Sequence, residues 1–216
     1  FLNTAGGLTG GDDLRLALAL GPGVRAVATT QTAERAYAST GAPARMEVSL
    51  TLAAGARLDW LPQETILFDR SHLHRRTRAD LAGDAQILMA EVLVMGRAAM
   101  GEVLTRLALQ DRREIWRAGR PVWIDPVTLD PAALGATAGL AGARAVATLV
   151  LVAPGAEDAL APLRAVLDPT MGAASAWDGR MVLRLAGPDL FPVKAALAAA
   201  LSVIRRGAPP PRVWQR

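Results

Sequence analysis

The segment Met46–Leu61, MEVSLTLAAGARLDWL, carries the pattern that decides the fold. Its first part, Met46–Leu52, alternates apolar with polar residues, and this period of two indicates a half-buried strand. Ala54-Gly55 is a turn signal, and Arg57–Leu61 resumes as a second strand that ends at a proline. A strand, a short turn and another strand form the unit that recurs along the chain.

The same rhythm continues on both sides of this segment. Leu14–Leu20 alternates in the same way, and Gly21-Pro22-Gly23 followed by Val24–Thr30 predicts a hairpin. Ile87–Met95 is a long apolar strand that carries Glu91. Further strands are expected at 65–68, 103–109, 113–117, 121–124 and 145–152, with turns at Gln110–Arg112 and Ala118–Arg120.

The last third of the chain adds helices to the strands. Glu157–Leu167 has apolar residues at helical spacing, and Asp189 can cap a final helix. Between them, Asp178-Gly179 is the strongest hairpin signal in the sequence. We therefore predict a mainly β fold, α+β by count, in which the strands stack as in a helical barrel or β-helix and two α-helices lie in the C-terminal third. No linker divides the chain, so one domain over 1–216 is expected.

Composition excludes several kinds of site. The 216 residues include no Cys and two His, which excludes disulfide frameworks, thiolate metal sites and cysteine nucleophiles. The net charge of +4 comes from arginines interleaved with acids, which is typical of a solvated surface rather than a nucleic-acid-binding stripe. The longest apolar run, Ala195–Leu201, is too short to cross a bilayer. No nucleophilic triad is recognisable, so no catalytic residue is assigned.

The most unusual stretch is Gly6–Asp13, GGLTGGDD. It lacks the Lys-Ser/Thr pair of a phosphate loop, and a strand rather than a helix follows it. A turn that uses positive φ angles is predicted at Gly6, Gly7, Gly10 and Gly11. The alternative is a functional turn that places Asp12 within reach of a partner or a cation.

Some acids lie in apolar surroundings. Glu91, inside its apolar strand, must find polar partners or shift its pKa upward. Arg97 and Glu102 are close enough in sequence to join it in one polar network. A structural ion pair and a polar channel are equally consistent with Glu91. Glu64 and Asp69 flank another short apolar strand, where polar strand ends and a functional role are about equally consistent with the pattern.

Two polar clusters have plain explanations. Glu34-Arg35 lies in a polar strand end with an internal ion pair. His72 and His74 are two residues apart, so an extended backbone puts both imidazoles on one face, which is compatible with metal ligation. Their segment, Arg70–Arg76, is rich in cationic side chains that oppose binding of a cation, so we interpret it as a solvated loop.

Five motifs, taken in order, match the pattern of one protein family. They cover nearly the whole chain and are Asn3–Asp12, Gln31–Tyr37, Trp60–Phe68, Gly96–Glu102 and Pro211–Trp214. Together they resemble the urease accessory protein UreD family, also called UreH. The family has further strands before the Gly-rich turn, so the chain, which starts at Phe1, is expected to lack its natural N-terminal strands. The family fold, mostly β and helical-barrel-like with two helices, agrees with the strand pattern.

The resemblance implies a non-enzymatic, cytoplasmic maturation factor. UreD-like proteins bind apo-urease and the accessory protein UreF, which recruits the GTPase UreG, and the assembly delivers nickel to the urease active site. GTP is used by UreG rather than by this chain. The resemblance also implies an internal path for transient nickel, no tightly bound cofactor, and no nucleic-acid or membrane partner.

Nickel in transit needs weak oxygen or nitrogen donors rather than a tight site. We therefore expect Asp12 and Glu91, and then Glu64, to lie on such a path. A supporting polar network is expected at Glu34, Arg35, Asp69, Arg97 and Glu102.

Two other classes of protein remain open from the sequence. A carboxylate-dependent carbohydrate-active enzyme on a β-helix-like fold would need two convergent acids in a cleft and would turn over substrate by itself. A pure scaffold would bind its partners tightly and would tolerate replacement of the acids.

Overall fold

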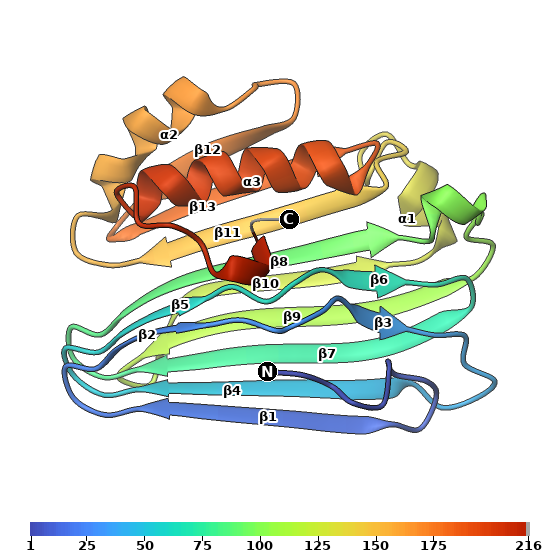
Figure 1. Ribbon diagram of the computed structural model, residues 1–216, viewed down its shortest axis with the longest axis horizontal. Coiled ribbons are helices and arrows are strands. Elements are labelled where there is room, and N and C mark those ends of the chain that lie inside the picture. Colours follow the sequence, from blue (N-terminus) through green and yellow to red (C-terminus); the bar gives the residue numbers. More distant parts are fainter. Residues whose placement is uncertain (215–216) are drawn as a thin grey trace.

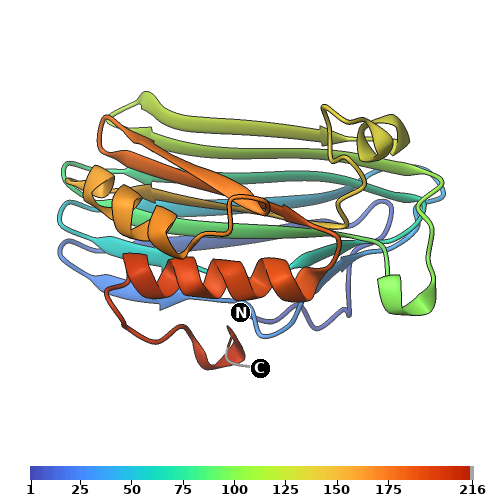
Figure 2. The same ribbon diagram turned by 90° about the horizontal axis from the view of Figure 1, so that it is seen from above.

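The computed structural model describes residues 1–214, so the last two residues of the predicted domain 1–216 lie outside the described part. Two β-sheets lie face to face, and helices α2 (Leu160–Val166) and α3 (Leu190–Ile204) cover the outer face of the larger sheet (Figures 1 and 2). The short helix α1 (Pro131–Gly135) follows the last strand of the smaller sheet. Among the described residues, no helix is long and apolar enough to cross a membrane.

The smaller sheet has five strands in the order β1-β4-β7-β9-β10. The first four run parallel, and the fifth returns antiparallel to its neighbour. Their bounds are β1 (Asp13–Leu20), β4 (Ala44–Leu52), β7 (Ser71–Leu81), β9 (Leu107–Arg117) and β10 (Arg120–Leu129). The parallel order means that the chain leaves this sheet after each strand and returns one coil later.

Between the strands of the smaller sheet, the chain passes through the larger sheet. Its order is β12-β13-β11-β8-β5-β2, and β6 and β3 extend it beside β8. The bounds are β2 (Arg25–Ala28), β3 (Glu34–Ala36), β5 (Arg57–Trp60), β6 (Thr65–Leu67), β8 (Gln86–Met95), β11 (Ala145–Val152), β12 (Gly172–Trp177) and β13 (Arg180–Gly187). The predicted β-helix-like stack and the two late helices are thus confirmed, and α1 is an additional helix.

The predicted hairpin between Leu14–Leu20 and Val24–Thr30 is wrong. β1 pairs with β4 in the smaller sheet, whereas β2 pairs with β5 in the larger one. The chain does turn here, because Gly23 has a φ of 69°. The turn, however, leads around a corner from one sheet to the other, so each strand finds its partner in the next coil.

The predicted turn at Gln110–Arg112 is also wrong, because β9 runs through it without a break. Asp111 and Arg113 point into the space between the sheets and form ion pairs there. These partners offset the cost of burying charge inside a strand. By contrast, the hairpin turn predicted at Asp178-Gly179 is confirmed, since both residues have the positive φ angles that a type I′ turn requires.

The segment with the two histidines was interpreted as a solvated loop, and this is wrong as well. It forms β7, the central strand of the smaller sheet, with inward residues buried and outward residues partly exposed. Its polar composition conceals a period of two. The polar side chains of the outward face meet solvent, and the inward Arg75 is buried with partners.

Apolar side chains form three clusters. One lies between the larger sheet and the helices, and two lie between the sheets. Along the inward face of β7, Leu73 belongs to one of these two and Ala79 to the other. Arg75 and Thr77 lie between them. A buried polar layer therefore separates the two apolar clusters inside the sandwich.

Candidate functional site

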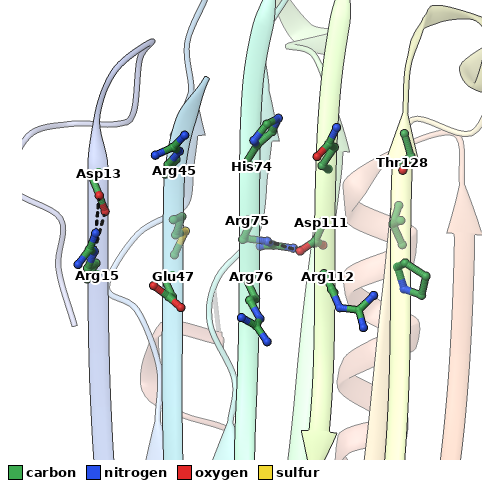
Figure 3. A pocket seen from close by; sticks show the side chains of 14 residues that line it. Asp13, Arg15, Arg45, Glu47, His74, Arg75, Arg76, Asp111, Arg112 and Thr128 are labelled. Carbon is green, nitrogen blue, oxygen red and sulfur yellow. Dashed lines mark hydrogen bonds and ion pairs between the residues drawn. The ribbon is translucent and has the colours of Figure 1, made fainter. Parts of the chain in front are cut away.

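Arg75 of β7 is the centre of the buried polar layer. Its Nη1 lies 2.9 Å from Glu91 Oε2 of β8. Its Nε and Nη2 donate to the two carboxylate oxygens of Asp111 of β9 at 2.9 and 2.7 Å, and this pair is drawn in Figure 3. Trp60 Nε1 donates to Glu91 Oε1 at 3.2 Å. One guanidinium therefore joins a carboxylate of the larger sheet to one of the smaller sheet.

From Asp111 the ion pairs continue toward the surface. Arg113 Nε lies 3.4 Å from Asp111 Oδ2, and Arg113 Nη2 lies 3.0 Å from Asp125 Oδ2. Arg184 of β13 donates to Asp125 from the other sheet, and its side chain is 54% exposed. Acids and arginines thus alternate from Glu91 to solvent. Three positive and three negative groups make the layer neutral.

Sheet register explains why residues far apart in the sequence meet here. On the smaller sheet, Arg75 is directly opposite Asp111, and Arg113 is directly opposite Asp125. On the larger sheet, Thr148 of β11 lies between Glu91 of β8 and Arg184 of β13 and is directly opposite each of them. The register therefore assembles the network from five strands.

The central pair is held in its charged form. Burial opposes the charge of Asp111, but the positive charges of Arg75 and Arg113 lower the pKa of this carboxyl below its usual value. Burial also acts against the charge of Arg75, yet Asp111 and Glu91 raise the pKa of its guanidinium. An ion that enters this layer must therefore displace a partner that the charged groups already have.

A pocket of about 590 Å³ opens beside the network. Its wall is mostly apolar and includes Arg113, Thr148 and Arg184, and Glu91 is the only acid among the described residues that line it. A glycosidase needs two carboxylates that flank the same bond. With one acid in its wall, the pocket can contact a cation or a polar group but does not present an acid–base pair.

The structure does not bring together the three acids predicted for nickel. Asp12 is exposed and accepts from the backbone N of Thr9 at 2.8 Å inside the Gly-rich turn. Glu64 is half-buried and pairs with Lys194 of α3 at 2.9 Å. Glu91 lies in the interior. Within residues 1–214, no group of three or more His, Asp or Glu could hold a metal ion together.

Arg97 and Glu102 form a pair of their own. Arg97 Nε lies 3.0 Å from Glu102 Oε2, and the backbone N of Asp69 donates to Glu102 Oε1 at 3.1 Å. Burial opposes the charge of Glu102, but these hydrogen bonds lower the pKa of its carboxyl. The cluster fastens the corner between β6 and β7. The arginine partner of Glu91 is Arg75, not Arg97 as the sequence suggested.

The Gly-rich turn uses three positive φ angles, as predicted, at Gly6 (82°), Gly7 (154°) and Gly11 (91°). Gly10 differs, since it is needed for space: a Cβ there would lie 2.7 Å from Ala42 O.

The remaining predicted residues hold this turn against β3. Glu34 accepts from Asn3 Nδ2 at 3.1 Å, and Arg35 Nη1 donates to Gly6 O at 3.2 Å. Leu8 N donates to Arg35 O at 2.7 Å. The first two motifs of the chain are therefore one structural unit, in which Glu34 and Arg35 support the turn.

Sequence reasoning missed most of the buried network: Arg75, Asp111, Arg113, Asp125 and Arg184. One signal was available. Leu109, Asp111, Arg113 and Ile115 alternate with polar residues in a period of two, which marks one face of a strand. Two opposite charges on a face that begins and ends with apolar residues indicate a buried ion pair.

The outer face of the smaller sheet is a second polar region, with a shallow depression of about 550 Å³ (Figure 3). Glu114 points outward, yet its side chain is 1% exposed because Arg76, Arg78 and Arg112 cover it. Burial opposes its charge, but hydrogen bonds from Arg112, Arg76 and Trp116 lower the pKa of Glu114 to about 2. The face is an organised set of charges rather than a disordered surface.

Comparison with known proteins agrees with the motif pattern. The family model described as "UreD urease accessory protein" matches residues 1–215. A urease accessory protein UreD of Cereibacter sphaeroides (strain ATCC 17025) is 56% identical over 100% of this chain and 80% of its own length. The proteins of the same name from Dinoroseobacter shibae and Jannaschia sp. are 53% and 50% identical over 100% of this chain and 77% and 81% of their own lengths. The chain therefore belongs to the UreD family of urease accessory proteins.

Proposed function

We propose that this chain binds apo-urease and the accessory protein UreF in the cytoplasm and helps to deliver nickel to the urease active site. Membership of the UreD family gives it a role in urease maturation. In the proposal, UreG joins through UreF and hydrolyses GTP, and this chain catalyses no reaction. The observation that carries the nickel step is the buried network with Glu91 beside a pocket that opens to solvent.

The network has the properties of a weak cation site. Glu91 offers carboxylate oxygens, which are suitable donors for a divalent ion. Arg75 already occupies one of these oxygens at 2.9 Å, so an arriving cation must compete with a guanidinium. This competition lowers the affinity and favours release, which a path requires and a storage site does not.

Two buried polar atoms support a hydrated interior. Within the described residues, Thr77 Oγ1 has no hydrogen-bond partner, and neither has Arg113 Nε, although the latter lies 3.4 Å from Asp111 Oδ2. The two residues are directly opposite each other on β9 and β7. Buried polar groups without a hydrogen bond to the protein are commonly satisfied by water. A cation that moves beside Glu91 could therefore keep part of its hydration shell.

Asp12 and Glu64 remain proposed donors nearer the surface. Asp12 is exposed on the Gly-rich turn, and Glu64 pairs with Lys194 at a half-buried position. Lys194 also donates to Gln63 Oε1 at 2.7 Å, so a divalent ion must compete with a held ammonium for Glu64, as it must compete with Arg75 for Glu91. In the proposal these acids act before or after Glu91 rather than together with it.

The test co-expresses the chain with urease, UreF and UreG and measures nickel bound to purified urease. Glu91→Gln and Asp12→Asn remove the charge but keep the shape and one of the two acceptor oxygens. We expect both variants to co-purify with apo-urease and UreF and to load less nickel. Glu47→Gln, an exposed residue of the outer face, is the matched control and should load fully.

Three outcomes would contradict parts of the proposal. Full nickel loading by both acid variants would remove the path and leave a scaffold. Failure of the unaltered chain to co-purify with apo-urease and UreF would remove the maturation complex. Turnover of a carbohydrate by the isolated chain would favour the carboxylate enzyme instead.

A further inference from the structure

The outer face of the smaller sheet carries the only two histidines of the chain. His72 and His74 both lie on the outward side of β7, and their ring centroids are 5.1 Å apart with the planes at 78°. Each is half-buried. β7 is paired with a strand on each side, so the imidazoles are placed as neighbours by a sheet rather than brought together by a loop.

A third neutral donor lies on the next strand. Gln110 of β9 is directly opposite His74, and the residue opposite His72 is the small Ala108. Both are exposed. Within residues 1–214, the Gln110 side chain forms no hydrogen bond, so its amide oxygen is available. Two imidazole nitrogens and one amide oxygen suit a divalent first-row transition ion, with water in the remaining positions.

The strand geometry removes most of the cationic neighbours that the sequence suggested. Arg75 points to the opposite side of the sheet and is buried. Arg76 lies outward but is bound to Glu114 at 3.0 Å. Two positive neighbours remain: Arg45, opposite His74 on β4, and Arg70, two residues before His72, which lies 4.0 Å from Asp69 Oδ2.

An acid on the neighbouring strand offsets part of the positive charge beside the histidines. Arg45 opposes a cation, but it is partly balanced by Asp13, its neighbour on β1.

We propose that His72 and His74, with Gln110 beside them, form an exchangeable surface site for one divalent transition ion of the Ni²⁺, Cu²⁺ or Zn²⁺ class. The site is distinct from the buried network, because it lies on the other side of the sheet. It does not depend on the proposed role in urease maturation, since a metal would bind to the isolated chain.

The test titrates Ni²⁺, and separately Cu²⁺, into the untagged chain at neutral pH. Because the chain has two histidines, its NMR spectrum has two sets of imidazole signals, and both should broaden together at substoichiometric paramagnetic metal. Calorimetry should give one ion per chain, with Cu²⁺ bound more tightly than Ni²⁺. Binding that leaves both imidazole signals unchanged would overturn the proposal, as would an absence of binding.

Variants sharpen the result. His72→Thr and His74→Thr keep a residue suited to a strand and should each weaken binding by about tenfold or more, since loss of a ligand costs at least as much as loss of an outer-shell partner. Arg45→Gln should strengthen binding, because it removes a positive charge beside the ion. A non-specific surface site does not predict the paired loss. Equal affinity in all variants would contradict the site and leave the urease experiment unaffected.

Discussion

Arg75 and Glu91 form an ion pair of 2.9 Å across the space between the two sheets, and each is 5% exposed. Apolar clusters lie on both sides of the pair. The interior of this protein therefore contains a charged layer where a sandwich of this kind would normally continue its apolar core.

Replacement of Arg75 should show how strongly the fold depends on this layer. Arg75→Met leaves the carboxylates of Glu91 and Asp111 buried without their shared partner, and we expect the free energy of unfolding in urea to fall by about 3–5 kcal/mol. Arg45→Met, on the outer face of the same sheet, should change it by no more than about 0.5 kcal/mol. Similar losses in both variants would show that the charged layer contributes no more to stability than an exposed arginine does.

The Gly-rich turn should tolerate no side chain at Gly7. A Cβ there would lie 2.5 Å from the Tyr37 ring and 2.7 Å from Arg35 O. Gly7→Ala should therefore lower the free energy of unfolding by about 1–3 kcal/mol. Gly41 has an ordinary φ and open space around it, so Gly41→Ala should stay within about 1 kcal/mol of the unaltered chain. The comparison fails if the two glycines respond alike in thermal unfolding.

Glu114 should make stability depend on acid pH. Its pKa is about 2 in the folded chain and 4.5 ordinarily. The contribution of its charge is thus complete above pH 4.5 and is lost as the pH falls toward 2. At neutral pH the free energy of unfolding of the unaltered chain should be higher than that of Glu114→Gln by up to about 3 kcal/mol. Urea titrations over this range should show the difference narrowing. A difference that stays constant with pH would rule out the titration of Glu114 as its source.

The stability of helix α3 should depend on the hydrogen bond that caps its N-terminus. Asp189 Oδ1 accepts from the backbone N of Phe191 at 2.8 Å and caps the helix. Asp189→Ala should cost about 1 kcal/mol of unfolding free energy, whereas Asp189→Asn keeps an acceptor and should cost a few tenths. If the asparagine variant loses as much as the alanine variant, the contribution comes from charge rather than from the cap.

Local patterns in the sequence were sufficient to predict elements that do not depend on which strands pair. The apolar run of β8 with Glu91 inside it, the Asp178-Gly179 hairpin and the cap of α3 each follow from a few adjacent residues. These patterns encode burial, turn geometry and capping directly. The buried position of Glu91 is likewise visible from its apolar neighbours.

The sequence alone could not supply what depends on pairing. Arg75 and Asp111 are 36 residues apart and meet because β7 and β9 are in one particular parallel register. Without that partner, the arginines of β7 indicate a loop and Asp111 indicates a turn. The hairpin predicted near Gly23 failed for the same reason, since a turn signal does not tell whether the next strand joins the same sheet.

The coiled order of strands also sets the sequence in which the protein can assemble on the ribosome. β4, β7 and β9 each add to the edge left by the strand before, so this sheet can grow as the chain emerges. Arg184 follows Asp125 by 59 residues, and β8 gains its antiparallel neighbour only when β11 has been made. A nascent chain stopped after β10 would carry an open, charged interior, and we expect it to need shielding by a chaperone until the last strands and helices cover it.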